Sequence, residues 1–371
     1  GINIISFAAF VATLSQRSGG LKYQSIIKDL LSVEQLSDTR RLLRSIIKWS
    51  VIIELSGSIL LYFSWGNSIY FISHEEKVFS SVFHAISAFN NAGFSLFSDN
   101  LHHIGVHDLV SFQLIIMLLI VLGGLGFFVL QDIFGISNIR QRFNFKWKTY
   151  HTSTKITIHM SLILILTGTV LFFILEQNGV LKGENFGNAL ITSLFQSITT
   201  RTAGFNTIDI GSLTKPVLFL FILLMFVGGG SGSTAGGIKV TTFALIMKSG
   251  IATLRGKKHI DFFKRNIPFD IVNKAFTIFL FALFVISTSI FALSISEPDT
   301  GFMKLAFEEF SAFATVGLST GITSDLSDAG RIIIIISMYV GRIGILSIAM
   351  MLSKKVISSR YQYAKTSIMV G

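Results

Sequence analysis

Three short polar segments each carry a glycine where backbone oxygens could bind a cation. In residues 199–206 (TTRTAGFN), Gly204 follows a short amphipathic run, residues 186–198, that is too brief to span the hydrocarbon. Non-helical backbone at membrane depth is tolerated only where it is buried in protein or lines water. Because glycine readily adopts positive φ, this segment can turn its carbonyls toward a lumen, where carbonyl oxygens replace the hydration shell of an ion.

The same arrangement recurs in two other parts of the chain. Residues 87–95 (SAFNNAGFS) contain Gly93 and residues 312–319 (AFATVGLS) contain Gly317, so the three glycines are 111 and 113 residues apart. A glycine break interrupts the apolar segment behind each of them, 30, 24 and 24 residues downstream, beginning at Gly123, Gly228 and Gly341. This regularity predicts three repeats, each made of a span, a half-span with its loop, and a second span.

The composition is that of an integral membrane chain. Hydrophobic residues make up 51% of the 371 residues and charged residues only 14%, with a mean hydropathy of +0.66 and 36 phenylalanines. The chain has no cysteine, which excludes disulfides and thiolate metal sites. The sequence offers no pairing of a nucleophile with a base, so an enzyme is not expected.

The net charge of +11 is concentrated in alternate loops. Residues 17–48, 140–155, 248–274 and 353–371 hold 23 of the 31 basic residues, whereas the intervening loops hold five of them and 13 of the 20 acidic residues. This alternation is the positive-inside pattern, and it argues against a nucleic-acid-binding face. It predicts a multi-pass protein of the cytoplasmic membrane, with linkers 17–48, 135–155 and 248–274 and the C-terminus in the cytoplasm and the glycine-bearing loops entering from outside.

The hydrophobic pattern predicts the elements that would position these loops. Spans are expected at residues 49–62, 109–134, 156–175, 217–247, 276–295 and 332–351, and half-helices at residues 74–90, 186–198 and 302–313. Residues 1–15 have the pattern of the end of an apolar helix. The chain is therefore expected to comprise the end of a first repeat with its linker at 1–40, a second repeat at 41–150, a third with an interrupted helix at 151–265, and a fourth with the C-terminal tail at 266–371.

Residues 228–239 (GGGSGSTAGGIK) superficially match a phosphate-binding loop. The nucleotide motif requires adjacent Gly-Lys after a strand, whereas Ile238 separates Gly237 from Lys239 and the flanking segments are membrane spans. A long glycine-rich break in a span instead supplies flexible backbone at membrane depth, which suits a gate or an ion site. A simple kink is the alternative.

Five charged residues lie at or near the expected membrane depth, where a charge costs about 2.5–3.5 kcal/mol unless it faces water or a partner. Besides Lys239, Arg201 is expected to brace its own loop from behind by donating to backbone carbonyls, or else to reach the interface. Arg342 suits the conduction path below the glycine loops, where it would hinder cations, or else a salt bridge between helices. Glu308 and Glu309 precede the last loop. They either modify the electrostatic field at that loop or are solvated at the membrane interface.

The histidines give weaker patterns. His103 and His107 have the i, i+4 spacing of a zinc-binding pair and lie beside His102 in an external loop, but no further set of carboxylates or cysteines accompanies them. His84 is expected to be a packed residue of a half-helix.

The motifs NNAGF, TRTAGFN and ATVGL, with GGGSGSTAGGIK and the GRIG segment at Gly341, resemble those of the Trk/Ktr/HKT family of potassium transporter membrane subunits, most closely its KtrB branch. The resemblance covers the whole chain. It implies an all-α integral membrane fold of helix–pore-loop–helix units around a pseudo-four-fold pore, with three complete repeats and the end of the first. It further implies potassium uptake, with K+ bound at the carbonyls of Gly93, Gly204 and Gly317. A role for Na+ stays open, and no covalently bound cofactor is implied.

Carried over residue by residue, the resemblance assigns two groups of functional residues. The ion selectivity filter would comprise Asn91, Ala92, Gly93, Phe94, Thr202, Ala203, Gly204, Phe205, Thr315, Val316, Gly317 and Leu318. The intramembrane gate would comprise Gly228, Gly229, Gly230, Ser231, Gly232, Ser233, Thr234, Ala235, Gly236, Gly237 and Lys239, together with Arg342 from the last helix.

The resemblance also implies a homodimer docked on a cytoplasmic ring of nucleotide-binding regulatory subunits of the KtrA/TrkA kind, which the basic linkers would face. The first outer helix and its pore loop are not in the sequence, so we expect either a fragment of a longer protein or a truncated gene. Two other functions stay open, a non-conducting scaffold subunit and a sodium-coupled secondary carrier. Parallel repeats that enter from one side favour a pore over a carrier.

Overall fold

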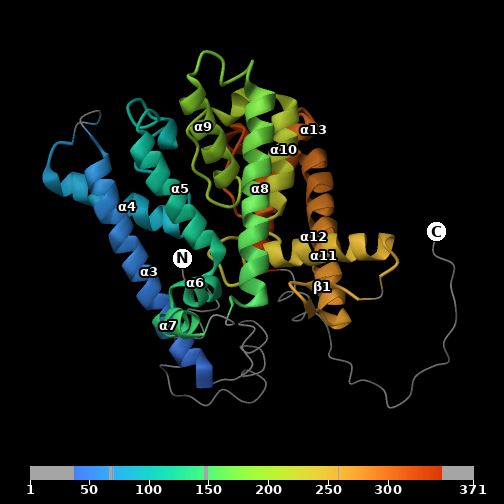
Figure 1. Ribbon diagram of the computed structural model, residues 1–371. Coiled ribbons are helices and arrows are strands. Elements are labelled where there is room, and N and C mark those ends of the chain that lie inside the picture. The colour runs from blue at the N-terminus through green and yellow to red at the C-terminus, as the bar shows by residue number, and fades with distance from the viewer. Residues whose placement is uncertain (1–36, 67–68, 70, 146–148, 258, 345–371) are drawn as a thin grey trace, which may run out of the picture.

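The computed structural model describes residues 37–344 except 67, 68, 70, 146–148 and 258. The predictions made for residues 1–36 and 345–371 therefore lie outside the described residues. In the part that is described, the chain is almost entirely helical (Figure 1).

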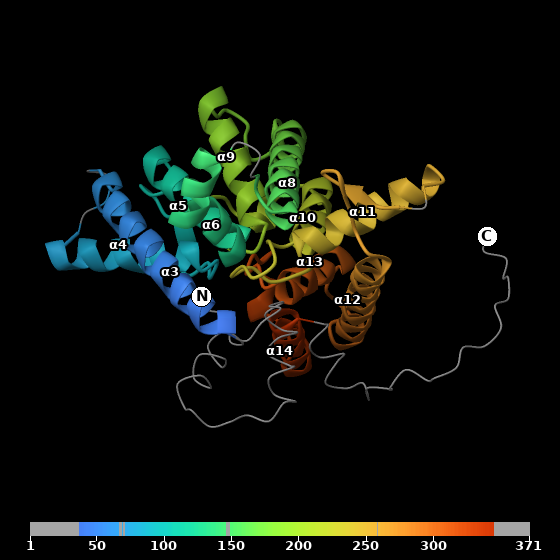
Figure 2. The same ribbon diagram turned by 60° about the horizontal axis from the view of Figure 1, so that its bottom comes forward.

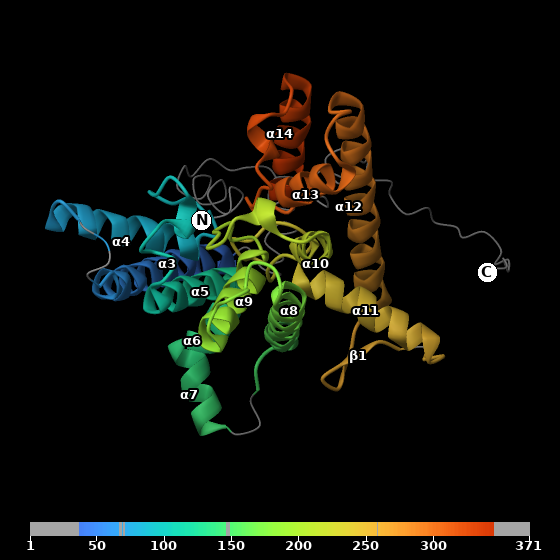
Figure 3. The ribbon, with the colours of Figure 1, turned by 90° about the horizontal axis from the view of Figure 1, so that it is seen from above.

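Three groups of described helices follow one order, in which a long helix, a short helix and a third helix succeed one another. The first group is α3 (Ser37–Ser64), α4 (His74–Phe89) and α5 (Val110–Leu125). The second is α8 (Thr152–Glu176), α9 (Phe186–Thr199) and α10 (Lys215–Phe226), and the third is α12 (Phe269–Ser296), α13 (Phe302–Phe313) and α14 (Asp328–Ile343). The groups lie beside one another around central loops (Figures 2 and 3). The pseudo-four-fold axis stays a prediction.

Among the described helices, α8, α12 and residues 45–64 of α3 are long and apolar enough to cross a membrane. Their outward faces carry large apolar side chains: Leu166 and Ile174 on α8 are 53% and 56% exposed, and Phe284 and Phe291 on α12 are 67% and 69% exposed. A helix that is apolar all round and exposes such side chains requires an apolar surrounding. The chain is therefore a membrane protein.

The span expected at residues 109–134 is interrupted at the glycine break that the sequence placed from Gly123 onward. It divides at Gly126 into α5 and α6 (Phe127–Phe134), which are bent by 103°. Gly126 has φ +94°, and the backbone N–H of Phe127 donates to the Gly232 carbonyl at 3.1 Å, so a distant segment fixes the bend. The span expected at residues 217–247 is interrupted where the sequence indicated, between α10 and α11 (Val240–Leu254).

The basic linkers contain structure that the sequence pattern did not indicate. Helix α7 (Ile136–Asn144) occupies part of residues 135–155, and strands β1 (Asp261–Phe262) and β2 (Arg265–Asn266) form an antiparallel hairpin within residues 248–274. The two residues of its turn, Phe263 and Lys264, have φ +48° and +63°, as in a type I′ turn. The all-α expectation is wrong in this detail. Three 3₁₀ turns complete the described elements: η1 (Asn100–His102), η2 (Ile210–Ser212) and η3 (Ile322–Ser324).

Two apolar clusters join the helix groups. One contains Trp65, Phe112 and Phe195, and so connects the first group with the second. The other contains Phe221 and Phe307, and connects the second group with the third. The loops that follow α4, α9 and α13 are therefore held against one another by packed cores.

Candidate functional site

The three glycine loops (residues 91–94, 202–205 and 315–318) have one backbone conformation. In each, the glycine and the residue two places before it have left-handed φ angles of 49–93°; the pairs are Asn91 and Gly93, Thr202 and Gly204, and Thr315 and Gly317. Positive φ is uncommon for residues other than glycine. The recurrence of this conformation three times shows that the sequence motifs specify one local structure, in which left-handed residues alternate with others.

The glycines of the three loops lie against one another although more than a hundred residues separate them. A Cβ atom placed on Gly93 would lie 2.5 Å from the Ala203 oxygen, and one on Gly204 would lie 2.2 Å from the Val316 oxygen. A Cβ on Gly317 would lie 3.7 Å from the Gly204 Cα. The positive φ angles and the first two distances leave room for glycine alone. The structure thus brings the three predicted filter glycines together.

The other predicted filter residues anchor the loops. Ala203, Phe205, Val316 and Leu318 are at most 3% exposed and belong to the apolar clusters, whereas Phe94 is 70% exposed. Hydroxyl groups of the half-helices hold two of the loops: Ser87 Oγ donates to the Phe94 carbonyl at 2.7 Å, and Thr199 Oγ1 donates to the Phe205 carbonyl at 2.5 Å. In the third, the Gly317 N–H donates to Ser311 Oγ at 3.2 Å. The loops are therefore fixed before any ligand binds.

The half-helices α4, α9 and α13 end four or five residues before the three glycines. The C-terminal end of a helix carries partial negative charge, equivalent to about half an elementary charge, and favours a cation nearby. Three such ends converge on the glycine loops. Backbone carbonyls and helix C-termini together make a site suited to a dehydrated monovalent cation.

Side-chain oxygens add to this site on one side of the glycines. Asn91 Oδ1, Thr202 Oγ1 and Thr315 Oγ1 occupy equivalent left-handed positions, are buried, and have no hydrogen-bond partner among the described residues. Buried acceptors without a partner are rare in native proteins and call for an explanation such as a bound ion. Three of them at equivalent positions point to cation coordination.

The glycine-rich break (residues 228–237) lies against all three glycine loops at these same positions. Asn91 Nδ2 donates to Thr234 Oγ1 at 3.1 Å. A Cβ on Gly228 would lie 3.4 Å from Thr202 Cγ2, and a Cβ on Gly236 would lie 2.2 Å from Thr315 Oγ1. The break therefore covers the end of the loops that carries the unpartnered oxygens.

Neighbouring backbone holds the break in place. A parallel bridge between Val227 and Ile238 closes its two ends, and the Gly230 N–H donates to the Gly124 carbonyl at 2.8 Å. Thr234 Oγ1 also approaches the Phe89 carbonyl, at 3.3 Å. These contacts are numerous but mainly polar, and the break has no large apolar side chain, so its displacement would not withdraw one from the packed cores beside it.

Basic side chains bind the carbonyls of the break. Arg342 Nη1 donates to the Thr234 carbonyl at 2.8 Å, and Lys239 Nζ donates to the Ala235 carbonyl at 2.7 Å. Arg342 has no carboxylate partner in the described part of the chain. Within these residues its partner is a backbone carbonyl of the break rather than a carboxylate of another helix.

Arg201 donates to backbone carbonyls, as predicted, but these belong to α8 and the break rather than to its own loop. It is 8% exposed and donates to the Ser161 carbonyl at 3.3 Å, to Ser161 Oγ at 3.1 Å and to the Gly228 carbonyl at 3.0 Å. Its guanidinium reaches α8 and the break. It joins the second glycine loop to both.

The acidic pair on α13 is not solvated at the interface, because Glu308 is 7% exposed and Glu309 is fully buried. Glu308 accepts hydrogen bonds from Ser319, Thr320 and Thr323, which lie just after the third glycine loop. Glu309 Oε1 accepts from Ser337 Oγ of α14 at 2.7 Å. The pair fixes this loop and the helix behind it.

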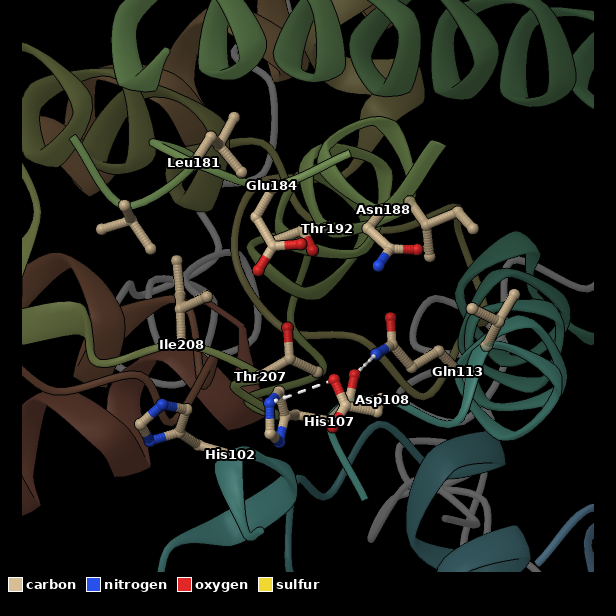
Figure 4. Close-up of a pocket in the computed structure, with 13 residues that line it drawn as sticks. His102, His107, Asp108, Gln113, Leu181, Glu184, Asn188, Thr192, Thr207 and Ile208 are labelled. Atoms are coloured by element: carbon tan, nitrogen blue, oxygen red, sulfur yellow. Dashed lines mark hydrogen bonds and ion pairs between the residues drawn. The ribbon is translucent and has the colours of Figure 1, made fainter. Parts of the chain in front are cut away.

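The histidine segment borders a cavity of about 210 Å³ between the first and second helix groups (Figure 4). His102 and His107 line it with Asp108 and Glu184, and His107 Nε2 lies 3.2 Å from Asp108 Oδ1. His103, which is at i, i+4 spacing from His107, stacks on the ring of Phe97, with centroids 5.1 Å apart. Among the described residues, no three His, Cys, Asp or Glu side chains are grouped to hold a metal ion.

Two contacts of the glycine loops have no signal in the sequence. His84 is buried, as expected, but its Nε2 also lies 3.1 Å from Ser95 Oγ, next to the first loop. Asn100 donates to the carbonyls of Gly93 and Gly204 at 3.2 and 3.4 Å. The second of these partners is 104 residues away, and no spacing rule relates the two positions.

The chain is similar to several known transport proteins. The model of a cation transport protein family, TrkH, matches residues 1–363. The chain is 39% identical to Ktr system potassium uptake protein B of Vibrio alginolyticus, over 90% of this chain and 71% of that protein. It is 34% identical to the potassium/sodium uptake protein NtpJ of Enterococcus hirae, over 100% of this chain and 81% of that protein. The solved potassium transporter TrkH from Vibrio parahaemolyticus shares the fold, with a TM-score of 0.71 and 18% identity over 88% of this chain and 67% of that one.

Proposed function

The chain belongs to the TrkH family of cation transport proteins, and from this we propose that it is the ion-conducting subunit of a Ktr/Trk-type system that takes up potassium across the cytoplasmic membrane. The observation that carries the proposal is the convergence of Gly93, Gly204 and Gly317 in one shared backbone conformation. Relatives 39% and 38% identical, from Vibrio alginolyticus and Bacillus subtilis, are potassium uptake proteins.

The glycine loops act as the selectivity filter. Their carbonyls replace water around the ion, and the C-terminal ends of α4, α9 and α13 lower the cost of bringing a charge to membrane depth. The hydrogen bonds from the half-helix hydroxyls limit how far the loops can close around a smaller ion. This rigidity would favour K+ over Na+. A relative that is a potassium/sodium uptake protein supports sodium as a second cargo or as a stimulating ion.

The glycine-rich break acts as the gate. It covers one end of the filter and is held there by Arg342, whose charge opposes cations, and by the bond between Thr234 and Asn91. Opening requires the break to move away from all three loops at once. Its glycines allow this because they carry no side chain that would have to cross the packed helices.

A cytoplasmic regulatory ring and a second copy of the subunit complete the proposal. Two relatives are proteins of a Ktr system, and the basic linkers of this chain suit an acidic or nucleotide-bearing partner on the cytoplasmic side. The linkers bear α7 and the β1–β2 hairpin, which extend from the helix groups at one end of the molecule (Figure 1).

Rubidium uptake into proteoliposomes tests the function. With purified protein and an outward K+ gradient, we expect saturable Rb+ entry that excess K+ blocks more strongly than excess Na+. Uptake that requires stoichiometric Na+ entry would favour the secondary carrier instead. No flux from a folded protein in the presence of its partner ring would favour the scaffold.

A further inference from the structure

Asn100 is locked in a conformation that presents its side-chain amide to the glycine loops. Its backbone is left-handed, with φ +58°, which asparagine tolerates better than most residues. Its Oδ1 accepts a hydrogen bond from the Leu101 N–H at 2.9 Å, and Leu101 is fully buried. The amide is therefore oriented before any ion binds, because its oxygen is hydrogen-bonded to the backbone of the buried Leu101.

The amide bridges two glycine loops from different helix groups. Asn100 Nδ2 lies 3.2 Å from the Gly93 carbonyl oxygen and 3.4 Å from the Gly204 carbonyl oxygen. These are the carbonyls of the glycines themselves, whereas the glycine-rich break contacts the loops two residues earlier, at Asn91 and its equivalents. The amide and the break therefore act on opposite ends of the loops.

The bridge is asymmetric. The positions seven residues past Gly204 and Gly317 hold Gly211 and Ser324, and Ser324 Oγ instead contacts the Gly321 carbonyl and Asp325. Among the described loops, one repeat thus supplies a donor that ties two filter carbonyls together. A neutral donor bound to two carbonyls fixes their separation and withdraws part of their negative charge from an ion.

We propose that Asn100 is a specificity-determining residue of the filter, which sets its preference among monovalent cations by holding the Gly93 and Gly204 carbonyls at a fixed spacing. This inference rests on the proposed transport function. Without the bridge, the two carbonyls are free to approach a smaller ion, so discrimination against Na+ falls.

Two substitutions remove the donor by different chemistry. Asn100→Gly removes the amide while accepting the left-handed backbone, and Asn100→Asp keeps the size but cannot donate to a carbonyl. Both variants should lower the preference for K+ over Na+ about fivefold to tenfold, a change of about 1–1.4 kcal/mol. The readout is the ratio of K+ and Na+ concentrations that halve Rb+ uptake, measured with the maximal rate and the midpoint of thermal unfolding.

The possible results distinguish a failure of this inference from a failure of the proposed transport function. If the two variants shift the preference for K+ over Na+ in opposite directions, the charge of residue 100 rather than the bridge sets that preference, and the inference is overturned. An unchanged ratio in both, with Rb+ uptake intact, would also overturn it. Asn138→Asp is the matched control, because its amide donates to the Gln131 carbonyl at 3.2 Å and belongs to the linker helix α7, outside the filter and the break. Absence of Rb+ uptake by the unmodified protein would instead contradict the proposed function.

Discussion

Adding one methyl group at Gly204 should widen the filter. The new Cβ would lie 2.2 Å from the Val316 oxygen and 3.3 Å from the Val316 carbonyl carbon, where ordinary contacts begin at 3.4 Å. The second and third glycine loops must therefore separate by about 1 Å, since the obstacle is backbone and cannot rotate away. The left-handed φ of +79° adds about 1–2 kcal/mol of strain for alanine.

We expect Gly204→Ala to lower the preference for K+ over Na+ by tenfold or more, because a displacement of about 1 Å in a preorganised site costs up to about a hundredfold. The assay is Rb+ uptake competed by K+ and by Na+, on protein whose folding is verified by thermal unfolding. Gly183→Ala is the matched control: its φ is +90°, but nothing lies within 4 Å of the new Cβ. It shares the backbone strain without the collision. If Gly204→Ala kept the ion preference of the unmodified protein, or if both variants lost it equally, the reasoning would be refuted.

Three further substitutions test the parts around the filter. Thr234→Val removes the hydroxyl that joins the break to the first glycine loop, worth about 0.5–1.5 kcal/mol, so the maximal Rb+ flux should rise about twofold to tenfold. Thr277→Val, which removes an exposed hydroxyl bonded only within α12, should leave the flux unchanged, and equal fluxes in the two variants would contradict a gating role. Arg342→Gln removes a charge-assisted bond of about 1.5–3 kcal/mol, so flux should rise at least tenfold, and a flux at or below that of the unmodified protein would count against it. Arg201→Lys keeps the charge but loses the guanidinium group that donates to both Ser161 and the break, so the free energy of unfolding in detergent should fall by about 1–3 kcal/mol. An unaltered unfolding midpoint would mean that these hydrogen bonds do not stabilise the fold.

Local patterns in the sequence were sufficient to locate the loops and half-helices. The half-helix expected at residues 302–313 is α13 at the same bounds, and the left-handed glycines lie where the recurring motifs placed them. Apolar runs and glycine spacing are properties of neighbouring residues, so they can be read without the fold. The role of these residues in ion selection stays a prediction.

Features that depend on distant contacts could not be predicted in this way. The bend at Gly126 is fixed by Gly232, the partners of Arg201 come from α8 and the break, and Asn100 reaches across to Gly204. Each contact joins residues that no helical or strand periodicity relates. Arg201 illustrates this difference. A charged side chain at membrane depth is expected to face partners inside the protein, but which residues are its partners depends on how α8 packs.

The location of a bound heavy cation tests the account most directly. Crystals of the protein grown in RbCl and measured at the rubidium absorption edge would give the position of the ion from anomalous scattering. We predict a peak between the carbonyl oxygens of Gly93, Gly204 and Gly317. Rubidium peaks elsewhere in the molecule, with none at these three glycines in an otherwise ordered filter, would contradict it.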